Sequence, residues 1–356
     1  MGELAYNAER IYALEEAGHQ LFGLWMQNPA YTLNTVGPLP FGNVEDVPYE
    51  KWKERINQIK PDIIYGLLNG GAIPLAHEVM IHTDIPFVWH FKEGPSFAMS
   101  SGLWSKLIDL YSKADGKIFI NEENQRWYQL FIGDMGSAFI MDGDLPKSDY
   151  FTNDFSLPFS DSDNAIHTVI PGRPIGIGVN EIKLLADQNI HVHLYNENYA
   201  EVREPFIKLA TSVAPSHVHL HNHCKPQDWV KEFSQYDAGW LHCFHSINNG
   251  NLFKITWNDL NFPARMNSLA AAGIPMLQMD NSRHIVAMQS QIKKYDIGIF
   301  INQWEELGAQ FHNKDRIKQL RRNAVQNRKF FSFDYYVPEL ISFFRKVIDE
   351  KQRKNK

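Results

Sequence analysis

The sequence predicts an α/β protein with two lobes, each built as a Rossmann-like, doubly wound parallel sheet. Short apolar runs alternate with amphipathic segments along most of the chain, as in strands joined by crossover helices. The 356 residues are too many for one ordinary core and enough for two. A polar stretch at 154–164, rich in Ser, Asp and Pro, separates two blocks of alternation and is interpreted as the interdomain linker.

The first block, residues 1–155, begins with helical patterns rather than with a strand. A doubly wound lobe normally opens with a strand that becomes central in its sheet. We therefore expect the first strand of this lobe to be missing, through truncation at an internal methionine or, alternatively, because the lobe lacks it. The predicted helices are 7–17, 49–59 and 73–81, and the predicted strands are 62–68, 85–90, 116–120 and 138–141.

The second block, residues 165–334, repeats the alternation, and residues 335–356 form an amphipathic helix with a basic tail that is expected to pack back. Ligands of such sheets bind beyond the carboxyl ends of the strands, so the sequence predicts a cleft between the lobes. The predicted strands are 167–170, 190–195, 216–221, 238–243, 275–279 and 297–301.

Composition excludes several classes of protein. The chain is 44% apolar and 21% charged, which indicates a globular protein, and its net charge of −6 argues against a nucleic-acid partner. Two cysteines, Cys224 and Cys243, are too few for a disulfide framework and fit a reducing compartment, so a cytoplasmic location is expected. No apolar run reaches membrane-spanning length, and the basic tail at 351–356 predicts at most a peripheral membrane contact.

The segment 262–277 predicts a loop, a short helix of small residues and a buried strand. Asn261 or Asp259 is the expected cap of this helix, and Gly273 is its expected end. Arg265 falls in the first turn, where the helix dipole disfavours a cation unless an anion is nearby. Free amides and a guanidinium at a helix start form a natural diphosphate site.

A second arginine lies in a glycine-rich turn at 171–178, between a predicted strand and a helix. Gly172, Gly176 and Gly178 permit close approach to the backbone, and Arg173 can bind phosphate oxygens through its planar fork. An ordinary tight strand-to-helix loop explains the same residues, so both interpretations stay open for this turn by itself.

These two segments and a third at 236–241 resemble the GT-B glycosyltransferases, through Gly172-Arg173-Pro174, the strand entry at 236–241 and the loop at 263–275. The resemblance implies two Rossmann-like lobes, with a nucleotide-diphosphate sugar held by the second lobe and an acceptor held by the first. It implies transfer of a sugar to a hydroxyl of a surface glycan, a lipid or a small molecule. It also implies that neither a metal nor any other cofactor is needed.

Arg173 and Arg265 match the basic, diphosphate-binding positions of that family. Ser268 stands where many members have a glutamate that binds the donor ribose, which puts this contact and the stereochemistry of transfer in doubt. His245, Ser246 and Asn248 lead into the donor loop and are candidate contacts to sugar or phosphate, or else plain loop residues.

In the first lobe, His90 and Glu93 match a strand-end pattern of the family, and Lys92 replaces its second histidine. His90 with an adjacent carboxylate can act as the base for an acceptor hydroxyl. The alternative is a core histidine followed by a solvated Lys92–Glu93 pair. The segment Asn69-Gly70-Gly71 ends another predicted strand, where two glycines admit substrate or simply form a turn.

His217, His219, His221 and His223 alternate and are expected to share one face of a strand. Only two of them could reach one zinc ion, since each i,i+2 step spans about 6–7 Å, so a polar face without metal is the preferred interpretation. Two other functions stay open: a nucleotide-sugar epimerase of the same architecture, and a degenerate, non-catalytic sugar-nucleotide-binding protein, which Ser268 would suit.

Overall fold

In the computed structural model, the chain forms two compact units. The first unit combines Met1–Lys147 with Ile255–Phe262 and Phe333–Lys356, and the second combines Ser148–Lys254 with Pro263–Ser332. The chain therefore crosses between units more than once, although each unit keeps its own core. The structure describes residues 8–24, 45–47, 49–68, 70–133, 136–196 and 204–356.

The first unit contains a four-stranded parallel sheet in the order β3-β4-β5-β6. Strands that are consecutive in the sequence are neighbours in the sheet, because each crossover places the next strand in parallel on the outer side of the previous one. The strands are β3 (Ile64–Leu68), β4 (Phe87–Phe91), β5 (Gly116–Phe119) and β6 (Ser137–Ile140). The helices after the strands are α4 (Ile73–His82), α5 (Pro95–Ser100), α6 (Trp104–Lys113) and α7 (Glu122–Phe131).

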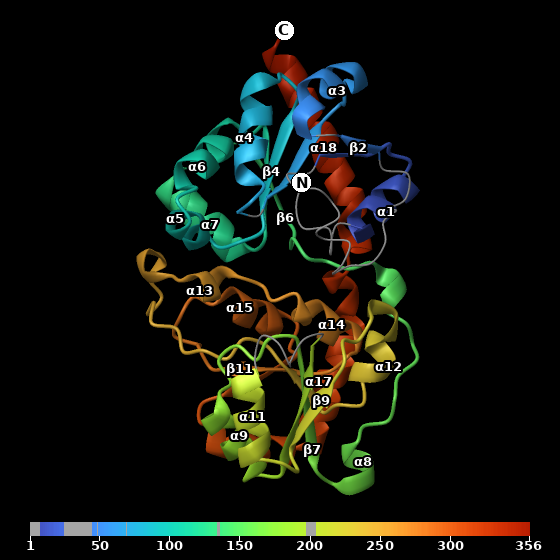
Figure 1. The fold of residues 1–356 in the computed structure, drawn as a ribbon, viewed down its shortest axis with the longest axis vertical. Helices are drawn as coiled ribbons and strands as arrows, with labels where there is room; N and C mark the ends of the chain where they lie inside the picture. Colours follow the sequence, from blue (N-terminus) through green and yellow to red (C-terminus); the bar gives the residue numbers. More distant parts are fainter. Residues whose placement is uncertain (1–7, 25–44, 48, 69, 134–135, 197–203) are drawn as a thin grey trace. The chain divides into compact units, whose positions relative to one another are not determined.

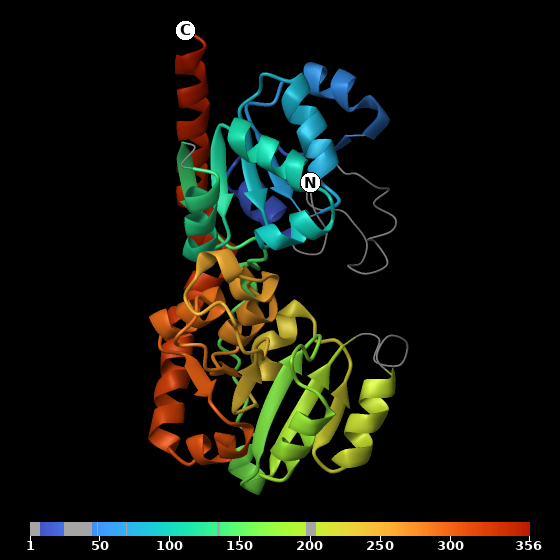
Figure 2. The ribbon, with the colours of Figure 1, turned by 90° about the vertical axis from the view of Figure 1, so that its left-hand side faces the viewer.

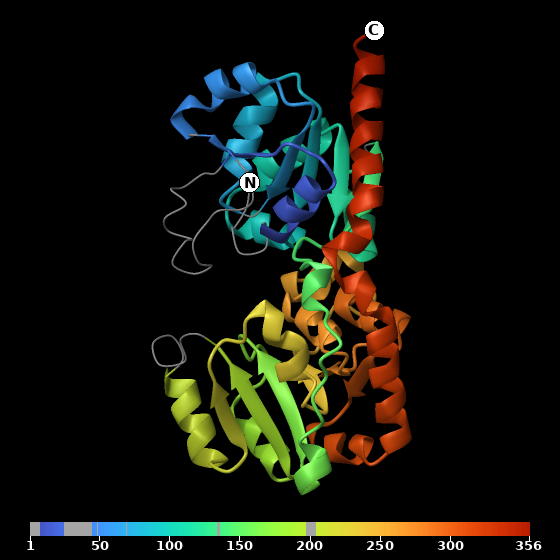
Figure 3. The ribbon, with the colours of Figure 1, turned by 90° about the vertical axis from the view of Figure 1, so that its right-hand side faces the viewer.

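One face of this sheet is covered by the long helix α18 (Phe333–Lys354), which Figure 2 shows in red alongside β6. Val347 of α18 packs so closely that a Cβ added at Gly116 would lie 2.6 Å from it. Helix α1 (Ala8–Glu16) lies beside α18 (Figure 3) and is fixed by Arg10, whose guanidinium donates to the Gly143 carbonyl at 2.9 Å. The predicted closing helix is thus part of the core of the first unit.

The other face of the sheet carries an aromatic cluster. Trp89 of β4 is fully buried and meets Tyr111 of α6 and Tyr128 of α7 edge-on, at ring-centroid distances of 5.4 and 5.1 Å. Tyr111 and Tyr128 stack on each other at 4.9 Å. Aromatic burial of this kind explains why the strand's apolar run is continuous rather than alternating.

Two short strands and a helical segment also precede the main sheet. Strands β1 (Phe22–Leu24) and β2 (Glu45–Val47) pair in parallel as a separate two-stranded sheet, which the sequence did not predict. The predicted helix at 49–59 is present as a 3₁₀ turn, η2 (Tyr49–Lys51), followed by α3 (Trp52–Ile59). Among the described residues, the first strand of the four-stranded sheet is β3.

The second unit contains a six-stranded parallel sheet in the order β12-β11-β10-β7-β8-β9. The order reverses beside β7, so β7 and β10 flank the switch point at which ligands of doubly wound sheets bind. The strands are β7 (Ile166–Pro171), β8 (Ile190–Tyr195), β9 (Val218–His221), β10 (Ala238–Trp240), β11 (Met276–Met279) and β12 (Gly298–Ile301). The predicted fold class, with two parallel α/β sheets and a long final helix, is confirmed.

Helices cover this sheet as well, and Figure 1 shows α9 and α11 side by side in the second unit. They pack on Ile170, Val192 and Leu194 in one continuous apolar cluster. The polar segment 154–164 lies on this unit, where the Phe159 amide donates to the Gln235 carbonyl at 2.9 Å. The helices are α8 (Ser160–Asp163), α9 (Val179–Ala186), α11 (Glu204–Val213), α12 (Trp229–Phe233), α14 (Arg265–Ala271), α15 (Ala287–Lys294), α16 (Leu307–Phe311) and α17 (Lys314–Asn327).

No helix within the described ranges is long and apolar enough to cross a membrane.

Candidate functional site

The glycine-rich turn after β7 is shaped by two residues with left-handed backbone. Gly172 has φ +83° and its amide donates to the Tyr195 carbonyl at 2.7 Å, which ties the turn to the end of β8. Gly176 has φ +78°, and a Cβ there would lie 1.4 Å from the carbonyl oxygen of Cys243. Only glycine fits at this contact, so the turn is held firmly against the chain that follows β10.

Two arginines meet at this turn. Arg265 is the first residue of α14 and is 9% exposed, and its guanidinium donates to the carbonyl oxygen of Arg173. Arg173 itself is exposed, and its side chain makes no hydrogen bond or ion pair with the residues that the structure describes. The structure therefore brings together the two residues that the sequence predicted as phosphate ligands, 92 residues apart, through the backbone of one and the side chain of the other, and the charges of both act on the same histidine, His242.

A third residue, His242, belongs to the same region. It follows β10, is 4% exposed, and its pKa is lowered to about 3, first by burial and then by the charges of Arg265 and Arg173. Burial disfavours the charged form of the ring, and the two arginine charges act in the same direction at the carboxyl ends of β7 and β10. Sequence reasoning did not select His242, because its burial beside both arginines is a tertiary feature.

Two local expectations for α14 are wrong. Its N-cap is Ala264, which makes no side-chain cap bond, because Asp259 instead caps a separate short helix, α13 (Trp257–Leu260), together with Thr256. The amides of Met266 and Asn267 are not free either, since they donate to carbonyls three residues earlier at 2.8 and 3.1 Å. Any anion bound here would meet guanidinium groups rather than this row of amides.

The loop after β10 is braced by its own polar side chains. The amide of Ser246 donates to Asn281 Oδ1 at 2.7 Å. The side chain of Asn248 is fully buried, with Nδ2 donating to the Ile285 carbonyl at 2.8 Å and Oδ1 accepting from the amides of Gly250 and Ile285. Among the predicted donor contacts of this loop, His245 is the one with an exposed side chain.

Ser268 lies in the middle of α14 and is 4% exposed. Its hydroxyl donates to the carbonyl of Arg265, one turn earlier, at 3.0 Å. This bond within the helix satisfies the hydroxyl and is a common arrangement for a buried serine. A ribose contact at Ser268 stays a prediction, and the hydroxyl would have to leave this bond to make it.

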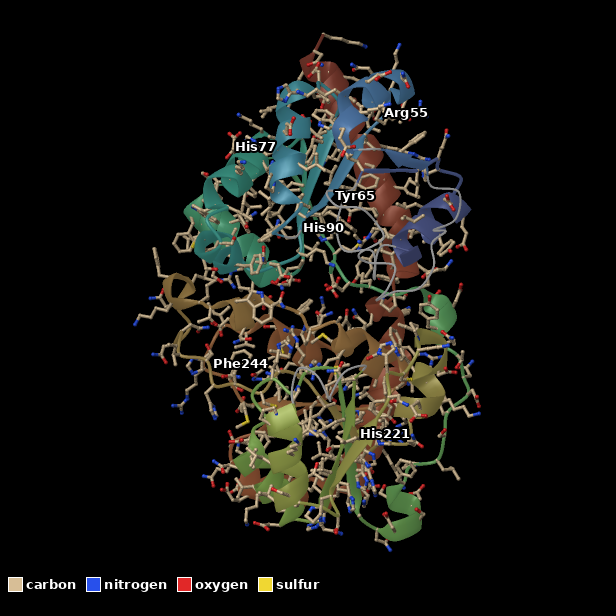
Figure 4. All side chains as sticks on the ribbon, in the orientation of Figure 1. Arg55, Tyr65, His77, His90, His221 and Phe244 are labelled. Carbon is tan, nitrogen blue, oxygen red and sulfur yellow. The ribbon has the colours of Figure 1, made fainter. Side chains whose placement is uncertain are left out.

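In the first unit, His90 is fully buried in β4, one residue before its end, where Figure 4 labels it near Tyr65. Its Nδ1 lies 2.6 Å from the hydroxyl of Tyr65, and the two rings stack. Burial, followed by the positive charges of Arg10 and Lys92, lowers the pKa of His90 well below its usual value. His90 is therefore neutral and weakly basic near pH 7, which is the arrangement of a core histidine.

Its neighbours Lys92 and Glu93 are half-buried and have separate partners. Lys92 forms an ion pair with Asp144 and crosses over Gly143, where a Cβ would lie 2.7 Å from Lys92 Cγ. Glu93 Oε2 accepts from the indole Nε1–H of Trp257 at 2.5 Å, which anchors α13 to the chain after β4. The alternative of a solvated Lys92–Glu93 pair is thus wrong.

Trp257→Phe is expected to lower the free energy of unfolding by about 1.5–3 kcal/mol, because it removes a donor from a charged acceptor in a half-buried place. Glu93→Gln keeps an acceptor oxygen and should cost less. Urea unfolding measures both values. The matched control is Trp229→Phe, since the indole of Trp229 makes no hydrogen bond with the described residues. Equal losses in Trp257→Phe and Trp229→Phe would contradict the anchoring role.

The glycine pair predicted on the acceptor side lies between β3 and α4. A Cβ at Gly70 would lie 2.7 Å from the ring of Phe97, so the turn packs tightly on α5. Gly71 is exposed. Asn69 lies outside the described residues. The close contact supports a packing role for Gly70, while access of substrate to this turn stays a prediction.

Within the described parts of the chain, no group of three or more His, Cys, Asp or Glu side chains is arranged to hold a metal ion.

Comparisons with known proteins address the fold. No protein-family model matches the chain, and a search of curated proteins also finds no match. Solved structures do match: a sucrose-phosphate synthase from Thermosynechococcus elongatus has TM-score 0.67 and 10% identity, covering 95% of this chain and 91% of that one. The chain has the GT-B fold.

Other GT-B structures match over similar lengths. A putative UDP-N-acetylglucosamine 2-epimerase from Listeria monocytogenes has TM-score 0.57 and 9% identity, covering 98% of this chain and 94% of that one. A glycosyltransferase involved in avilamycin A biosynthesis has TM-score 0.53 and 10% identity, with coverages of 95% and 88%. The fold is thus shared by nucleotide-sugar glycosyltransferases and epimerases, and identities this low carry no residue roles.

Proposed function

We propose that this chain is a glycosyltransferase that moves a sugar from a nucleotide-diphosphate sugar to an acceptor hydroxyl. The observation that carries the proposal is the meeting of Arg173 and Arg265 at the switch point of the second unit's sheet. The proposed role of this unit is donor binding, and that of the first unit is acceptor binding.

The chemistry follows from charge. When the glycosidic bond to the diphosphate breaks, negative charge develops on the leaving oxygen. The exposed guanidinium of Arg173 and the buried one of Arg265 would neutralise that charge, and donors already in position need no reorganisation at the moment of reaction. The lowered pKa keeps His242 neutral. Its ring therefore adds a hydrogen-bonding group beside the two arginines without adding any charge.

On the acceptor side, Glu93 is a better candidate for the base than His90. A base must reach the proton that it removes, and His90 is fully buried with its Nδ1 occupied by Tyr65. Glu93 is half-buried, and the bond from Trp257 fixes the orientation of its carboxylate. Lys92, Gly70 and Gly71 complete the proposed acceptor side.

The first experiment is a thermal-shift screen of the whole chain against a panel of nucleotide-diphosphate sugars. A true donor should stabilise the protein by about 2.7 kcal/mol at a hundredfold excess over Kd. Release of nucleoside diphosphate is then followed with and without a mixture of glycan, lipid and small-molecule acceptors. If the protein transfers the sugar, release of nucleoside diphosphate should depend on the acceptor. A new glycoside should then form in an amount equal to the nucleoside diphosphate released.

The matches to epimerase structures make epimerisation the second candidate. That reaction predicts a change in the sugar of the nucleotide without any acceptor, which nuclear magnetic resonance detects directly. Tight binding with neither product would indicate a non-catalytic sugar-nucleotide-binding protein. The absence of a shift with every nucleotide sugar would contradict all three functions.

A further inference from the structure

Six histidines lie on one face of three neighbouring strands in the second unit. The register pairs His167 of β7 with His191 of β8, and His193 of β8 with His219 of β9. Side chains alternate along a strand, so the opposite face carries the apolar cluster under α9 and α11. These histidines, named here the histidine network, are His167, His191, His193, His217, His219 and His221.

Five of the six rings are joined by hydrogen bonds from ring to ring, whereas His217 packs against the ring of His191 and lies 3.3 Å from Asn189 Oδ1. His167 Nε2 lies 3.0 Å from Asp163 Oδ2, and His167 Nδ1 lies 3.0 Å from His193 Nε2. His193 Nδ1 in turn lies 2.9 Å from His221 Nε2. A separate link of 2.9 Å joins His191 Nδ1 to His219 Nε2. The longer chain therefore runs from Asp163 across β7 and β8 to the edge strand β9.

The order of protons along this chain is set by its first member. The Asp163 carboxylate can only accept, so His167 donates through Nε2 and, when neutral, must accept at Nδ1. His193 then donates through Nε2 and accepts at Nδ1 from His221 Nε2–H. Every link is satisfied when all three rings are neutral and carry their proton on Nε2.

The same reasoning limits how many protons the chain can take up. One added proton on His167 reverses the direction of the other links, and each link survives with a donor and an acceptor. Two added protons, on His167 and His221, present an N–H to both nitrogens of His193. A neutral imidazole already carries one proton, so one link must then face N–H against N–H and break.

The charged and titratable groups around the network do not remove this limit. Helix α8 contributes Asp163, α12 contributes Glu232, which bonds the hydroxyl of Tyr195, and the segment before β10 contributes Tyr236 and Asp237. Cys224 follows β9 and lies near Glu232. The carboxylates stand at the two ends of the chain of rings, whereas His193 in the middle faces other histidines, Tyr236 and Phe159.

Burial and the neighbouring histidines act in the same direction. They lower the pKa of His193 to about 2 and that of His191 to about 4, and the pKa values of His219 and His221 are also lowered, in each case chiefly by burial. A base whose pKa is lower in the folded state contributes its full stability above the unfolded value of about 6.5. That contribution is lost as the pH falls below this value, because the unfolded chain then binds more protons.

The network also reaches the glycine-rich turn. The ring of His221 stacks on Tyr195 at 4.4 Å, with an interplanar angle of 9°. The carbonyl of Tyr195 accepts from the amide of Gly172. Movement of the end of β8 would therefore be felt at the turn that carries Arg173.

We propose that the chain from Asp163 through His167 and His193 to His221, within the histidine network, is an acid-sensitive fastening of β8 and β9, which holds while at most one proton is added to the chain and releases these strands when a second proton enters. The proposal is independent of the reaction that the protein catalyses. It makes the outer edge of the second unit's sheet, and with it the Gly172 turn, looser in acid than the rest of that unit.

The test compares wild-type protein with His193→Phe, which keeps an aromatic ring and removes the central link. Urea unfolding between pH 7.5 and 5.0 gives the unfolding equilibrium constant. For each extra proton bound by the unfolded chain, this constant should rise about tenfold for every pH unit by which the pH is lowered. The slope in His193→Phe should be smaller by about one proton. His221→Gln, at the half-exposed end, serves if His193→Phe does not fold, and His312→Gln, exposed in the same unit, is the control with unchanged slope.

Amide hydrogen exchange locates the effect. In wild-type protein, protection of β8 and β9, corrected for intrinsic exchange, should fall between pH 7.5 and 5.0 while that of β11 and β12 is retained. In the network variants this difference should shrink. Equal slopes in wild type, network variants and control, or uniform loss of protection across the sheet, would overturn the proposal. Neither measurement depends on donor or acceptor, so failure here is distinct from failure of the proposed function.

Discussion

Replacing Arg265 with alanine is expected to weaken sugar-nucleotide binding and to slow transfer by about 100-fold or more. A pair of charge-assisted hydrogen bonds to a diphosphate contributes about 3 kcal/mol, and every 1.4 kcal/mol corresponds to a factor of ten. The effect should be large because Arg265 is nearly buried and lies against the Arg173 carbonyl, where solvent screens its charge poorly. Calorimetric titration with the donor and a transfer assay measure the two losses.

The controls separate charge from packing. Arg265→Met keeps most of the side-chain volume without the charge and should behave like the alanine variant, whereas Arg265→Lys keeps the charge without the planar fork and should fall between. Arg322→Ala, on the exposed side of α17, should bind and react as wild type does. Wild-type affinity and turnover in a folded Arg265→Ala protein would eliminate Arg265 from the donor site.

Among glycine-to-alanine substitutions in the second unit, Gly176→Ala is expected to cause the largest loss in the free energy of unfolding. The new Cβ would lie 1.4 Å from the Cys243 carbonyl oxygen, so the backbone of one of the two segments must move. The left-handed φ of +78° adds about 1 kcal/mol of strain for a residue with a side chain. Together these effects should cost about 4 kcal/mol or more, which is at the upper end for a single substitution.

The matched control is Gly250→Ala, at a glycine with φ +73° whose added Cβ would have its nearest neighbour 3.8 Å away. It carries the same kind of backbone strain without the clash and should cost about 1 kcal/mol. Urea unfolding gives both values. A Gly176→Ala protein as stable as Gly250→Ala would mean that the turn and the chain after β10 are not in firm contact.

The sequence predicted most strands of both sheets because a strand buried on both faces is a short, nearly continuous apolar run. Strand β8 has the predicted bounds, and β4 and β11 differ from them by one or two residues at an end. The prediction of the N-cap of α14 was wrong for a local reason. Asp259 is a good capping residue, but its side chain caps the start of the short helix α13, which ends at Leu260.

The candidate donor site was predictable in part. Arg173 could be selected from its glycine-rich turn and Arg265 from its place at a helix start, because a cation at a helix start needs an anion. His242 could not be selected in this way, since its significance comes from burial beside both arginines. The bonds of Ser246 and Asn248 could not be predicted either, because a loop segment far along the chain, at 281–285, supplies their partners; their contact with a donor stays a prediction.

By itself, the sequence determined the class of fold, the approximate places of the strands and the two arginine-bearing turns, because these depend on local stereochemistry and on the period of apolar residues. Only the tertiary structure decided which strands are neighbours. It placed Arg265 on a carbonyl 92 residues away, Trp257 on a carboxylate 164 residues away, and five histidines from three strands in ring-to-ring hydrogen bonds. Periodicity tells which face of a strand is buried, but not which segment covers that face.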